Sequence, residues 1–423
     1  MKKRLLFIAY FYPPLGGPGV QRPLKTIKYL KDLGWLVDVL TVDDIQFHSY
    51  DWELFKESKA DNIYRTKSLD LMSLYKRIKP QKEKKDNIYF NTPEKYKKLI
   101  RGLFPIDDKI GWYPFAYHKA LELLRSRKYD AVVATIGPYT SGVLAYYLHK
   151  KTKIPFFIDY RDHWTLHSYP QYAADVLHKH AQNFEKKMLE SANGVFVVNS
   201  IMRNQMISCF GRHLQNKIEV VYNGFDEDDF MSVTKPNSEL TYIRYVGNFF
   251  GHRSIDYFIK ALCELKDEGK IPNNTRFEFI GNYYIETLNL LKTEKLNKYI
   301  NIIPQVEHPK AVNCMQTADL LLLFVPSAAG DDFTPGKVFE YIRANVPILA
   351  MIPENGEPAQ ILRKLGHKYI CNMEDTESIK KNLICFLEGK TEQSIRYDMI
   401  YSRENQSKIF SEFIEKKLFD EKD

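Results

Sequence analysis

The chain has 423 residues, of which 44% are hydrophobic and 27% are charged, and its formal net charge is +8. This is the composition of an ordinary globular protein, and the length favours two domains of about 200 residues each. The charge is too small for a dedicated nucleic-acid binder but is compatible with anionic ligands or anionic lipid. We therefore expect no nucleic-acid partner.

The N-terminus and the cysteines indicate the compartment. An apolar run at 5–10 is too short for a signal peptide and is followed by two prolines, so we interpret it as a buried strand. No segment approaches the roughly 20 apolar residues of a membrane span. Five cysteines are scattered without metal-site spacing, which indicates reduced core residues. We expect a cytoplasmic protein, with peripheral attachment to the inner face of the plasma membrane as a further option.

Short apolar runs alternate with amphipathic stretches along the chain. In the first part, strands are predicted at 5–10, 36–42, 131–135, 155–158, 195–198 and 218–221, and helices at 20–33 and 138–151. In the second part, strands are predicted at 242–246, 277–280, 300–303, 320–324, 347–351 and 369–371. Strands that alternate with helical patterns indicate βαβ units and parallel sheets.

We therefore predict the α/β fold class, with two doubly wound, Rossmann-like domains whose parallel sheets face each other across a cleft. The polar stretch 223–239 marks the boundary. The first domain is predicted at 1–225 and the second at 226–390, with a C-terminal helix in 391–423 that packs back on the first domain. The cleft between the domains is the expected ligand site.

Residues 71–109 form a basic insertion in the first domain, with 11 Lys and Arg residues against 5 Asp and Glu residues. A solvated surface insertion explains this pattern. The alternative is a helix pair that rests on anionic lipid headgroups, where each basic residue contributes about 1 kcal/mol.

A glycine-rich loop follows the first predicted strand. Gly16, Gly17 and Gly19 let the backbone pass close to a ligand. Arg22 stands where a dinucleotide-binding fingerprint needs its third glycine. We therefore expect this loop to form part of the rim of the cleft rather than a NAD site.

The segment Asp159-Tyr-Arg-Asp-His-Trp164 follows a predicted buried strand, so its polar residues emerge at the carboxyl end, where α/β folds place their sites. Asp162 and His163 are candidate contacts to a sugar hydroxyl or to the attacking group. An internal Arg–Asp ion pair that closes the loop is the alternative.

In the second domain, Gly247 and Gly251 flank a loop that ends at a helix start. Arg253 in this loop can offer a fork of donors to a diphosphate, and an exposed arginine on a first helical turn is the alternative. The pair Asp226 and Asp228 is interpreted as solvated linker acids, and we expect no obligate metal.

The segment Asp332-Phe-Thr-Pro-Gly-Lys-Val-Phe-Glu-Tyr341 predicts an acidic loop, a Pro-Gly turn and a helix start that carries Lys337. A helix dipole disfavours a cation in the first turn, so Lys337 is better explained by a bound phosphate. Asp332 on the loop and Glu340 on the helix can hold hydroxyls from two rings of one ligand. In the alternative, Glu340 caps the helix or pairs with Arg343.

Together these motifs resemble the GT-B glycosyltransferases, specifically the glycosyl transferases group 1 family, which includes many enzymes of bacterial surface-polysaccharide synthesis. The resemblance covers nearly the whole chain, and its most specific parts are 247–254 and 334–341. It implies that the second domain binds a nucleotide-diphosphate sugar and that the first domain binds a saccharide or lipid-linked acceptor.

The resemblance also implies roles for single residues. Arg253 and Lys337 correspond to the clamp on the diphosphate, Glu340 to the acid that holds the ribose, and Asp332 to the acid that contacts the donor sugar. The glycines Gly17, Gly247 and Gly336 correspond to donor-binding positions, and Asp162 and His163 to groups on the acceptor side. Two positions depart from the family pattern: residue 332 is Asp rather than Glu, and Asn248 replaces a common basic residue.

Members of this family are typically retaining and metal-independent, so the resemblance implies no obligate cofactor beyond the nucleotide sugar as co-substrate. Three alternatives have the same fold or ligand. A nucleotide-sugar epimerase needs acid and base groups around the second sugar carbon, and His163 is one of few histidines available. A phosphorylase needs a pyridoxal lysine, for which the sequence offers no candidate. A non-catalytic nucleotide-sugar-binding protein would tolerate loss of Asp162 and His163.

Overall fold

The computed structural model describes residues 2–43, 45, 50–70, 102, 104, 106–167, 172, 174–230, 233, 238–249, 255–389 and 394–420. The chain divides into two compact units, which we treat separately. Unit 1 comprises Met1–Asn223 and Arg403–Asp423, and unit 2 comprises Gly224–Ser402. Most of the basic insertion 71–109 lies outside the described residues, so its proposed lipid contact stays a prediction.

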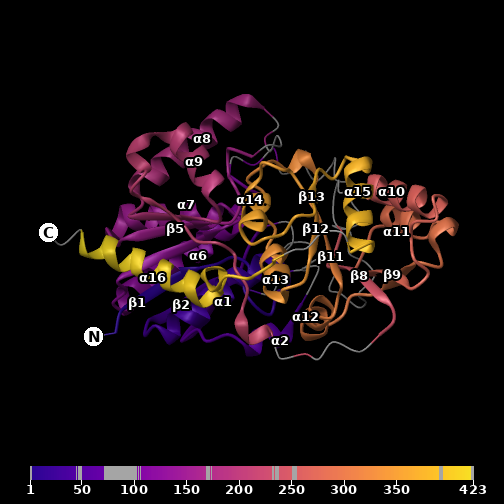
Figure 1. The fold of residues 1–423 in the computed structure, drawn as a ribbon. Helices are drawn as coiled ribbons and strands as arrows, with labels where there is room; N and C mark the ends of the chain where they lie inside the picture. The colour runs from indigo at the N-terminus through magenta and orange to yellow at the C-terminus, as the bar shows by residue number, and fades with distance from the viewer. Residues whose placement is uncertain are drawn as a thin grey trace. The chain divides into compact units, whose positions relative to one another are not determined.

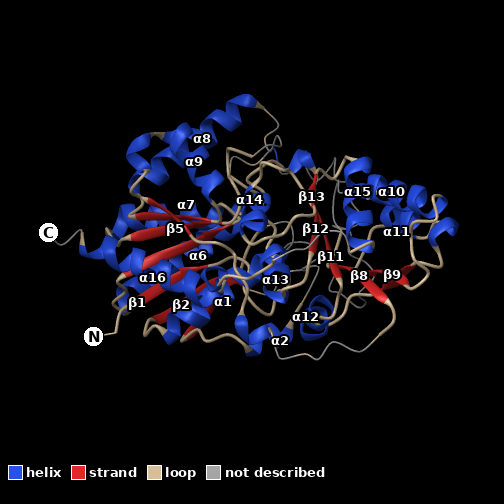
Figure 2. Ribbon diagram, in the orientation of Figure 1, coloured by secondary structure: helices blue, strands red, loops and turns tan. Residues whose placement is uncertain are grey.

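Unit 1 is built on a parallel sheet (Figures 1 and 2). Its seven strands lie in the order β3-β2-β1-β4-β5-β6-β7. The strands are β1 Arg4–Ile8, β2 Leu36–Val42, β3 Asn62–Thr66, β4 Ala131–Ile136, β5 Phe156–Tyr160, β6 Gly194–Val197 and β7 Ile218–Val220. The described helices are α1 Pro18–Asp32, α2 Trp52–Lys56, α6 Tyr113–Ser126, α7 Thr140–Thr152, α8 Asp175–Ser191, α9 Ser200–Phe210 and α16 Arg403–Phe419, with 3-10 helices at Ile110–Trp112 and Arg212–Leu214.

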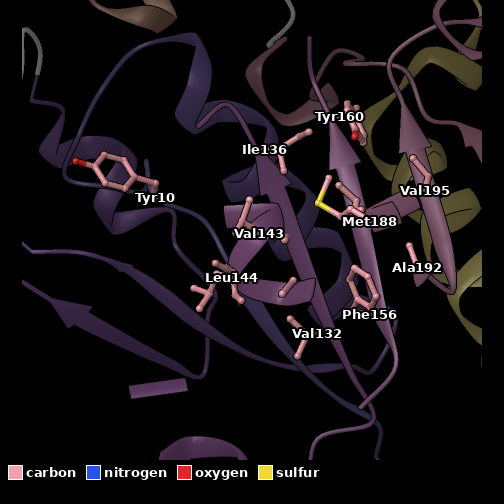
Figure 3. Close-up of a cluster of buried hydrophobic side chains, with 14 of the residues drawn as sticks. Tyr10, Val132, Ile136, Val143, Leu144, Phe156, Tyr160, Met188, Ala192 and Val195 are labelled. Carbon is pink, nitrogen blue, oxygen red and sulfur yellow. The ribbon is translucent and has the colours of Figure 1, made fainter. Parts of the chain in front are cut away.

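Helices cover both faces of this sheet, so β4 and β5 are buried along their whole length. Alternate residues of each strand point to opposite faces, which is why their sequences are nearly continuous apolar runs. On one face, Val132 and Ile136 of β4 belong to the same buried cluster as Val143 of α7 and Met188 of α8 (Figure 3). The other face carries α1 and α16.

Helix α16 belongs to unit 1 although it lies at the end of the chain. The ring of Phe410 stacks on that of Phe196 in β6 with centroids 3.8 Å apart, and the Trp35 indole donates to the Ser411 hydroxyl at 2.8 Å. The helix begins at Arg403, after a described stretch 394–398 without helix and a 3-10 turn Met399–Tyr401.

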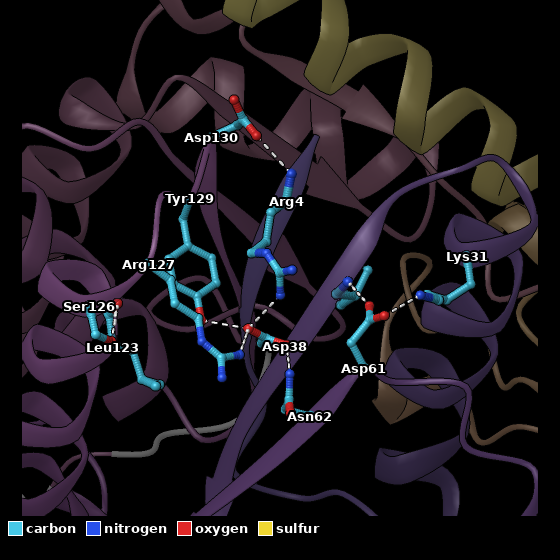
Figure 4. Close-up of polar contacts among 11 residues, drawn as sticks. Arg4, Lys31, Asp38, Asp61, Asn62, Leu123, Ser126, Arg127, Tyr129 and Asp130 are labelled. Carbon is cyan, nitrogen blue, oxygen red and sulfur yellow. Dashed lines mark hydrogen bonds and ion pairs between the residues drawn. The ribbon is translucent and has the colours of Figure 1, made fainter. Parts of the chain in front are cut away.

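A buried carboxylate joins strands near the amino ends of this sheet. Asp38 in β2 accepts hydrogen bonds from Arg4 at 3.0 Å, Asn62 at 2.7 Å and Tyr129 at 2.6 Å (Figure 4). Burial by itself would raise the pKa of Asp38, but these donors and the charge of Arg4 outweigh it and lower the pKa. This network stabilises the sheet at the amino ends of its strands, away from the carboxyl ends.

Unit 2 has a parallel sheet of six strands in the order β10-β9-β8-β11-β12-β13. The strands are β8 Thr241–Val246, β9 Thr275–Ile280, β10 Ile300–Ile303, β11 Leu320–Phe324, β12 Ile348–Met351 and β13 Ile370–Cys371. The described helices are α10 Asp256–Asp267, α11 Ile285–Leu291, α12 His308–Gln316, α13 Lys337–Ala344, α14 Glu357–Lys364 and α15 Thr376–Leu387, with 3-10 helices at Glu227–Asp229, Glu294–Leu296, Ser327–Ala329 and Met399–Tyr401.

The predicted α/β class with two Rossmann-like parallel sheets is confirmed. Two local interpretations were wrong or incomplete. The edge strand β3 was not predicted, because all five of its residues are half-buried and it lacks an apolar run. Asp226 is not a solvated linker acid: it is 1% exposed and caps the 3-10 turn Glu227–Asp229, where it accepts from the Asp228 N–H. Asp228 itself is exposed, as expected.

Candidate active site

The strand order of unit 2 reverses between β8 and β11, and the loops that leave these two strands lie at a topological switch point. Ligands of open α/β sheets bind at this position, beyond the carboxyl ends of the strands. Helix α13 begins there, so the sequence segment 332–341 reaches the carboxyl end of β8.

Lys337 is the first residue of α13, as predicted, and its Nζ atom is held at the end of β8. It donates to the Tyr245 hydroxyl at 2.9 Å and to the Val246 carbonyl at 3.1 Å, and it lies 4.2 Å from the centroid of the Tyr245 ring. An ammonium group has three N–H donors, so one donor remains for a ligand. The lysine is therefore preorganised as a cation at the switch point.

Gly247 and Tyr341 make this position possible. Gly247 has φ 139°, and a Cβ atom there would lie 2.0 Å from the Lys337 Nζ. The Tyr341 hydroxyl accepts from the Val246 N–H at 2.9 Å and donates to the Val246 carbonyl at 3.2 Å. Burial raises the pKa of Tyr341, so its hydroxyl keeps its proton and remains a donor.

The other candidates of this segment lie on the loop before α13 and in the first turn of that helix. Gly336 is the exposed residue that precedes the helix, and Asp332 is half-buried on the loop. Glu340 is half-buried in the first turn of α13. Arg343 forms its ion pair with Glu227, through an Nε donor at 2.6 Å, so the alternative pairing of Arg343 with Glu340 is not the one observed.

Arg253 and Gly251 lie outside the described residues, so the proposed two-cation clamp remains a prediction for Arg253. The described part of their loop is anchored: the Asn248 side-chain oxygen accepts from the Asn282 N–H at 2.7 Å. Gly281 allows this approach, because a Cβ atom there would lie 2.2 Å from the Gly247 carbonyl oxygen.

Unit 1 has its own switch point, between β1 and β4. Gly17, with φ 95°, directly precedes α1 and follows the loop that leaves β1. Arg22 in α1 is 4% exposed and binds the Asp159 carboxylate at 2.6 Å, and Asp159 also accepts from Thr135 at 3.1 Å. An Arg–Asp ion pair therefore does hold this region together, but the arginine comes from α1 rather than from the loop after β5.

The loop after β5 separates the two remaining candidates. Asp162 is exposed, whereas His163 is 2% exposed and its Nε2 atom lies 2.7 Å from the Gln205 side-chain oxygen. The assignment of Asp162 and His163 as sugar contacts remains a prediction.

A buried carboxylate braces the same loop. Glu185 of α8 accepts from the backbone N–H of Thr165 at 3.1 Å and from the Tyr160 hydroxyl at 2.9 Å. Burial raises the pKa of Glu185 to about 7.

Sequence reasoning missed Tyr245, Tyr341 and Glu185 as elements of these sites. Tyr245 and Tyr341 are 1% and 0% exposed, and in the sequence they resemble core aromatics. Their hydroxyl contacts depend on which strands are neighbours. A signal was available in Tyr245, which directly precedes the Val-Gly pair at the end of a predicted strand.

Among the described residues, no group of three or more His, Cys, Asp or Glu side chains is arranged to hold a metal ion. No helix in the described part of the chain is both long and apolar enough to span a membrane.

Two open parallel α/β units, each with polar groups at its switch point, define the GT-B class of fold, and solved structures agree. A glycosyltransferase from Rickettsia africae aligns with a TM-score of 0.58 at 14% identity, over 99% of this chain and 97% of that one. The lipopolysaccharide outer core galactosyltransferase WaaB aligns with a TM-score of 0.58 at 14% identity, over 98% and 99%. A UDP-GlcNAc 2-epimerase from Neisseria meningitidis bound to UDP-GlcNAc aligns with a TM-score of 0.54 at 14% identity, over 98% and 100%.

At this identity the structures show a shared fold, and family models are more specific. The model of Glycosyltransferase Family 4 matches residues 24–229, and that of Glycosyl transferases group 1 matches residues 226–404. The chain therefore belongs to the glycosyl transferases group 1 family and is a glycosyltransferase, as the resemblance implied. No curated protein sequence matches it.

Proposed function

We propose that this glycosyltransferase moves a sugar from a nucleotide-diphosphate donor to a saccharide or lipid-linked acceptor in bacterial surface-polysaccharide synthesis, with retention and without an obligate metal. Unit 2 binds the donor and unit 1 the acceptor. The solved UDP-GlcNAc complex of the Neisseria protein, which has the same fold, supports a nucleotide-sugar donor. The likeness to WaaB supports a role in surface-saccharide synthesis.

The observation that carries the proposal is the position of Lys337. A cation on the first residue of a helix is disfavoured by the helix dipole, and here two neighbouring oxygens hold it in place. Negative charge develops on the departing diphosphate during transfer. A preorganised cation at that position stabilises the transition state more than it stabilises the bound nucleotide sugar. This difference typically lowers the barrier by several kcal/mol.

The other residues follow from this placement. Gly336 precedes helix α13, and Gly247 lies against the Lys337 Nζ atom. Because neither glycine has a side chain, the backbone at both positions can approach a phosphate closely. We assign Glu340 to the ribose, Asp332 to the donor sugar and Arg253 to the diphosphate beside Lys337.

The test has a binding and a kinetic part. A panel of nucleotide sugars is screened for thermal stabilisation of the full chain, where a ligand at about 100 times its dissociation constant adds roughly 2.7 kcal/mol. The variant Lys337→Met is then compared with Lys298→Met. Lys298 is a matched control, because it also lies near a tyrosine ring, 5.9 Å from the Tyr299 centroid, and donates to a side-chain oxygen, that of Asn273, at 2.8 Å.

We expect Lys337→Met to lower the transfer rate roughly a hundredfold, and Lys298→Met to leave it unchanged. The proposal is rejected if no nucleotide sugar stabilises the chain, or if transfer by the Lys337 variant equals that of the parent.

A further inference from the structure

Arg161, one residue beyond β5, extends its guanidinium into the switch point of unit 1. The Nη1 atom lies 2.6 Å from the position of a Cβ on Gly19, which belongs to the first turn of α1. The Nη2 atom lies 2.7 Å from the position of a Cβ on Gly137, which follows β4. The two strands next to the switch point, β1 and β4, are thus each followed by a glycine that leaves space for the Arg161 guanidinium: Gly19 in the helix after β1, and Gly137 directly after β4.

The Arg161 guanidinium uses only some of its N–H groups in the hydrogen bonds that the structure describes. Its Nε donates to the Ile136 carbonyl at 3.2 Å, and its Nη2 donates to the Gly137 carbonyl. A guanidinium has five N–H groups, so three of them have no protein acceptor among the described residues. Both acceptors used are neutral carbonyls.

No described carboxylate forms an ion pair with Arg161. Asp159 is engaged by Arg22 and Thr135, and Asp162 is exposed and acts on Arg161 only through space. Burial lowers the pKa of Arg161, and the nearby carboxylates offset this only in part. Arg161 is half-buried. A cation partly withdrawn from water without a bonded counter-ion is costly, and an oxyanion placed against the free N–H groups would offset that cost.

We propose that Arg161 binds an oxyanion carried by the acceptor, either a phosphate or a carboxylate group. The guanidinium fork matches the paired oxygens of both groups. The acceptor class is then an anionic saccharide or a phosphate-bearing lipid-linked saccharide rather than a neutral sugar. This inference rests on the proposed function, because it takes unit 1 to be the acceptor-binding unit.

The test is calorimetric titration of the full chain with inorganic phosphate, at constant ionic strength, for the parent, Arg161→Gln and Arg203→Gln. Arg203 is a matched control, because it too donates to two backbone carbonyls of unit 1, those of Ile218 at 3.0 Å and Gln215 at 2.9 Å. We expect Arg161→Gln to weaken phosphate binding at least about tenfold and Arg203→Gln to leave it unchanged. Equal affinity of Arg161→Gln and the parent overturns the inference, as does a parent that binds no phosphate or acetate.

Acetate titrated in the same way separates the two sources. Loss of phosphate binding alone in Arg161→Gln supports a phosphate group, and loss of acetate binding alone supports a carboxylate. If Arg161→Gln does not fold, Gly19→Ala replaces it. This variant keeps the charge and adds a methyl group against Nη1, and unchanged anion binding in it overturns the inference.

Lys337→Met separates this inference from the donor site. Phosphate binding that persists in Lys337→Met and is lost in Arg161→Gln supports an anion site in unit 1. Phosphate binding that is lost in Lys337→Met and kept in Arg161→Gln places the anion at the donor site. Likewise, a loss of uridine diphosphate affinity in Arg161→Gln as large as the loss of phosphate affinity assigns the anion to the donor. Either result overturns the inference and leaves the proposed function standing, whereas the proposed function fails on its own if no nucleotide sugar stabilises the parent chain.

Discussion

A Cβ atom on residue 247 would lie 2.0 Å from the Nζ atom of Lys337, so Gly247 and Lys337 can hold their observed positions only together. The glycine also has φ 139°, a conformation that side-chain-bearing residues rarely adopt. The lysine and the glycine are 90 positions apart in the sequence, and the neighbouring strands β8 and β11 bring them together.

Gly247→Ala should displace the ammonium group and impair transfer. A displacement of about 1 Å at a reacting centre typically costs about a hundredfold in rate, and we expect kcat/KM to fall by that order. The control is Gly389→Ala, which also has positive φ, 62°, but no atom within 4 Å of the added Cβ. Both variants should lose stability, and only Gly247→Ala should lose activity. Equal activity of the two would contradict the role of this contact.

Asp159→Asn should destabilise unit 1 strongly, because it leaves the Arg22 guanidinium charged and 4% exposed without its counter-ion. Breaking one side of a buried ion pair costs about 3–5 kcal/mol. Urea unfolding measures the change. Asp32→Asn, which breaks the half-exposed pair with Lys59, serves as the control and should cost less than about 1 kcal/mol. A similar cost for both variants would show that the buried pair contributes little.

The stability of Glu185→Gln relative to that of the parent should increase as pH rises. Burial raises the pKa of Glu185 from 4.5 to about 7, so the folded state holds this proton more tightly than the unfolded state. Its contribution to stability is complete below about pH 4.5 and is lost as pH rises to about 7, by on the order of 3 kcal/mol. Melting temperatures of the parent, Glu185→Gln and the exposed control Glu190→Gln across this range test it. A difference between parent and Glu185→Gln that does not change with pH contradicts the shift.

His367→Leu should remove a source of acid sensitivity from unit 2. The ring is 2% exposed, neither of its nitrogens has a hydrogen-bond partner, and burial lowers its pKa from 6.5 to about 4. The neutral ring therefore contributes stability above pH 6.5, which is lost as pH falls toward about 4, by on the order of 3 kcal/mol. Urea unfolding as a function of pH should show a flatter profile for His367→Leu than for the exposed control His118→Leu. Parallel profiles would show that His367 is not the group responsible.

Much of the architecture could be predicted from local pattern. Strand β11 is a continuous apolar run and β4 is interrupted only by Thr135, because sheets covered on both faces need apolar strands. The helix start at Lys337 follows from the Pro-Gly turn before it. The edge strand β3 escaped prediction, since a strand with one neighbour needs no apolar run.

The sequence by itself determined the α/β class, the two units and the polar loops at the ends of buried strands, because these depend on periodicity within a few residues of each position. Only the tertiary structure decided which loops meet. Arg22 and Asp159 are 137 positions apart, and Arg161 reaches glycines that follow two different strands. The order of the strands in each sheet determines which loops come into contact. A hydrogen bond between residues distant in the sequence leaves no periodic signal in the chain.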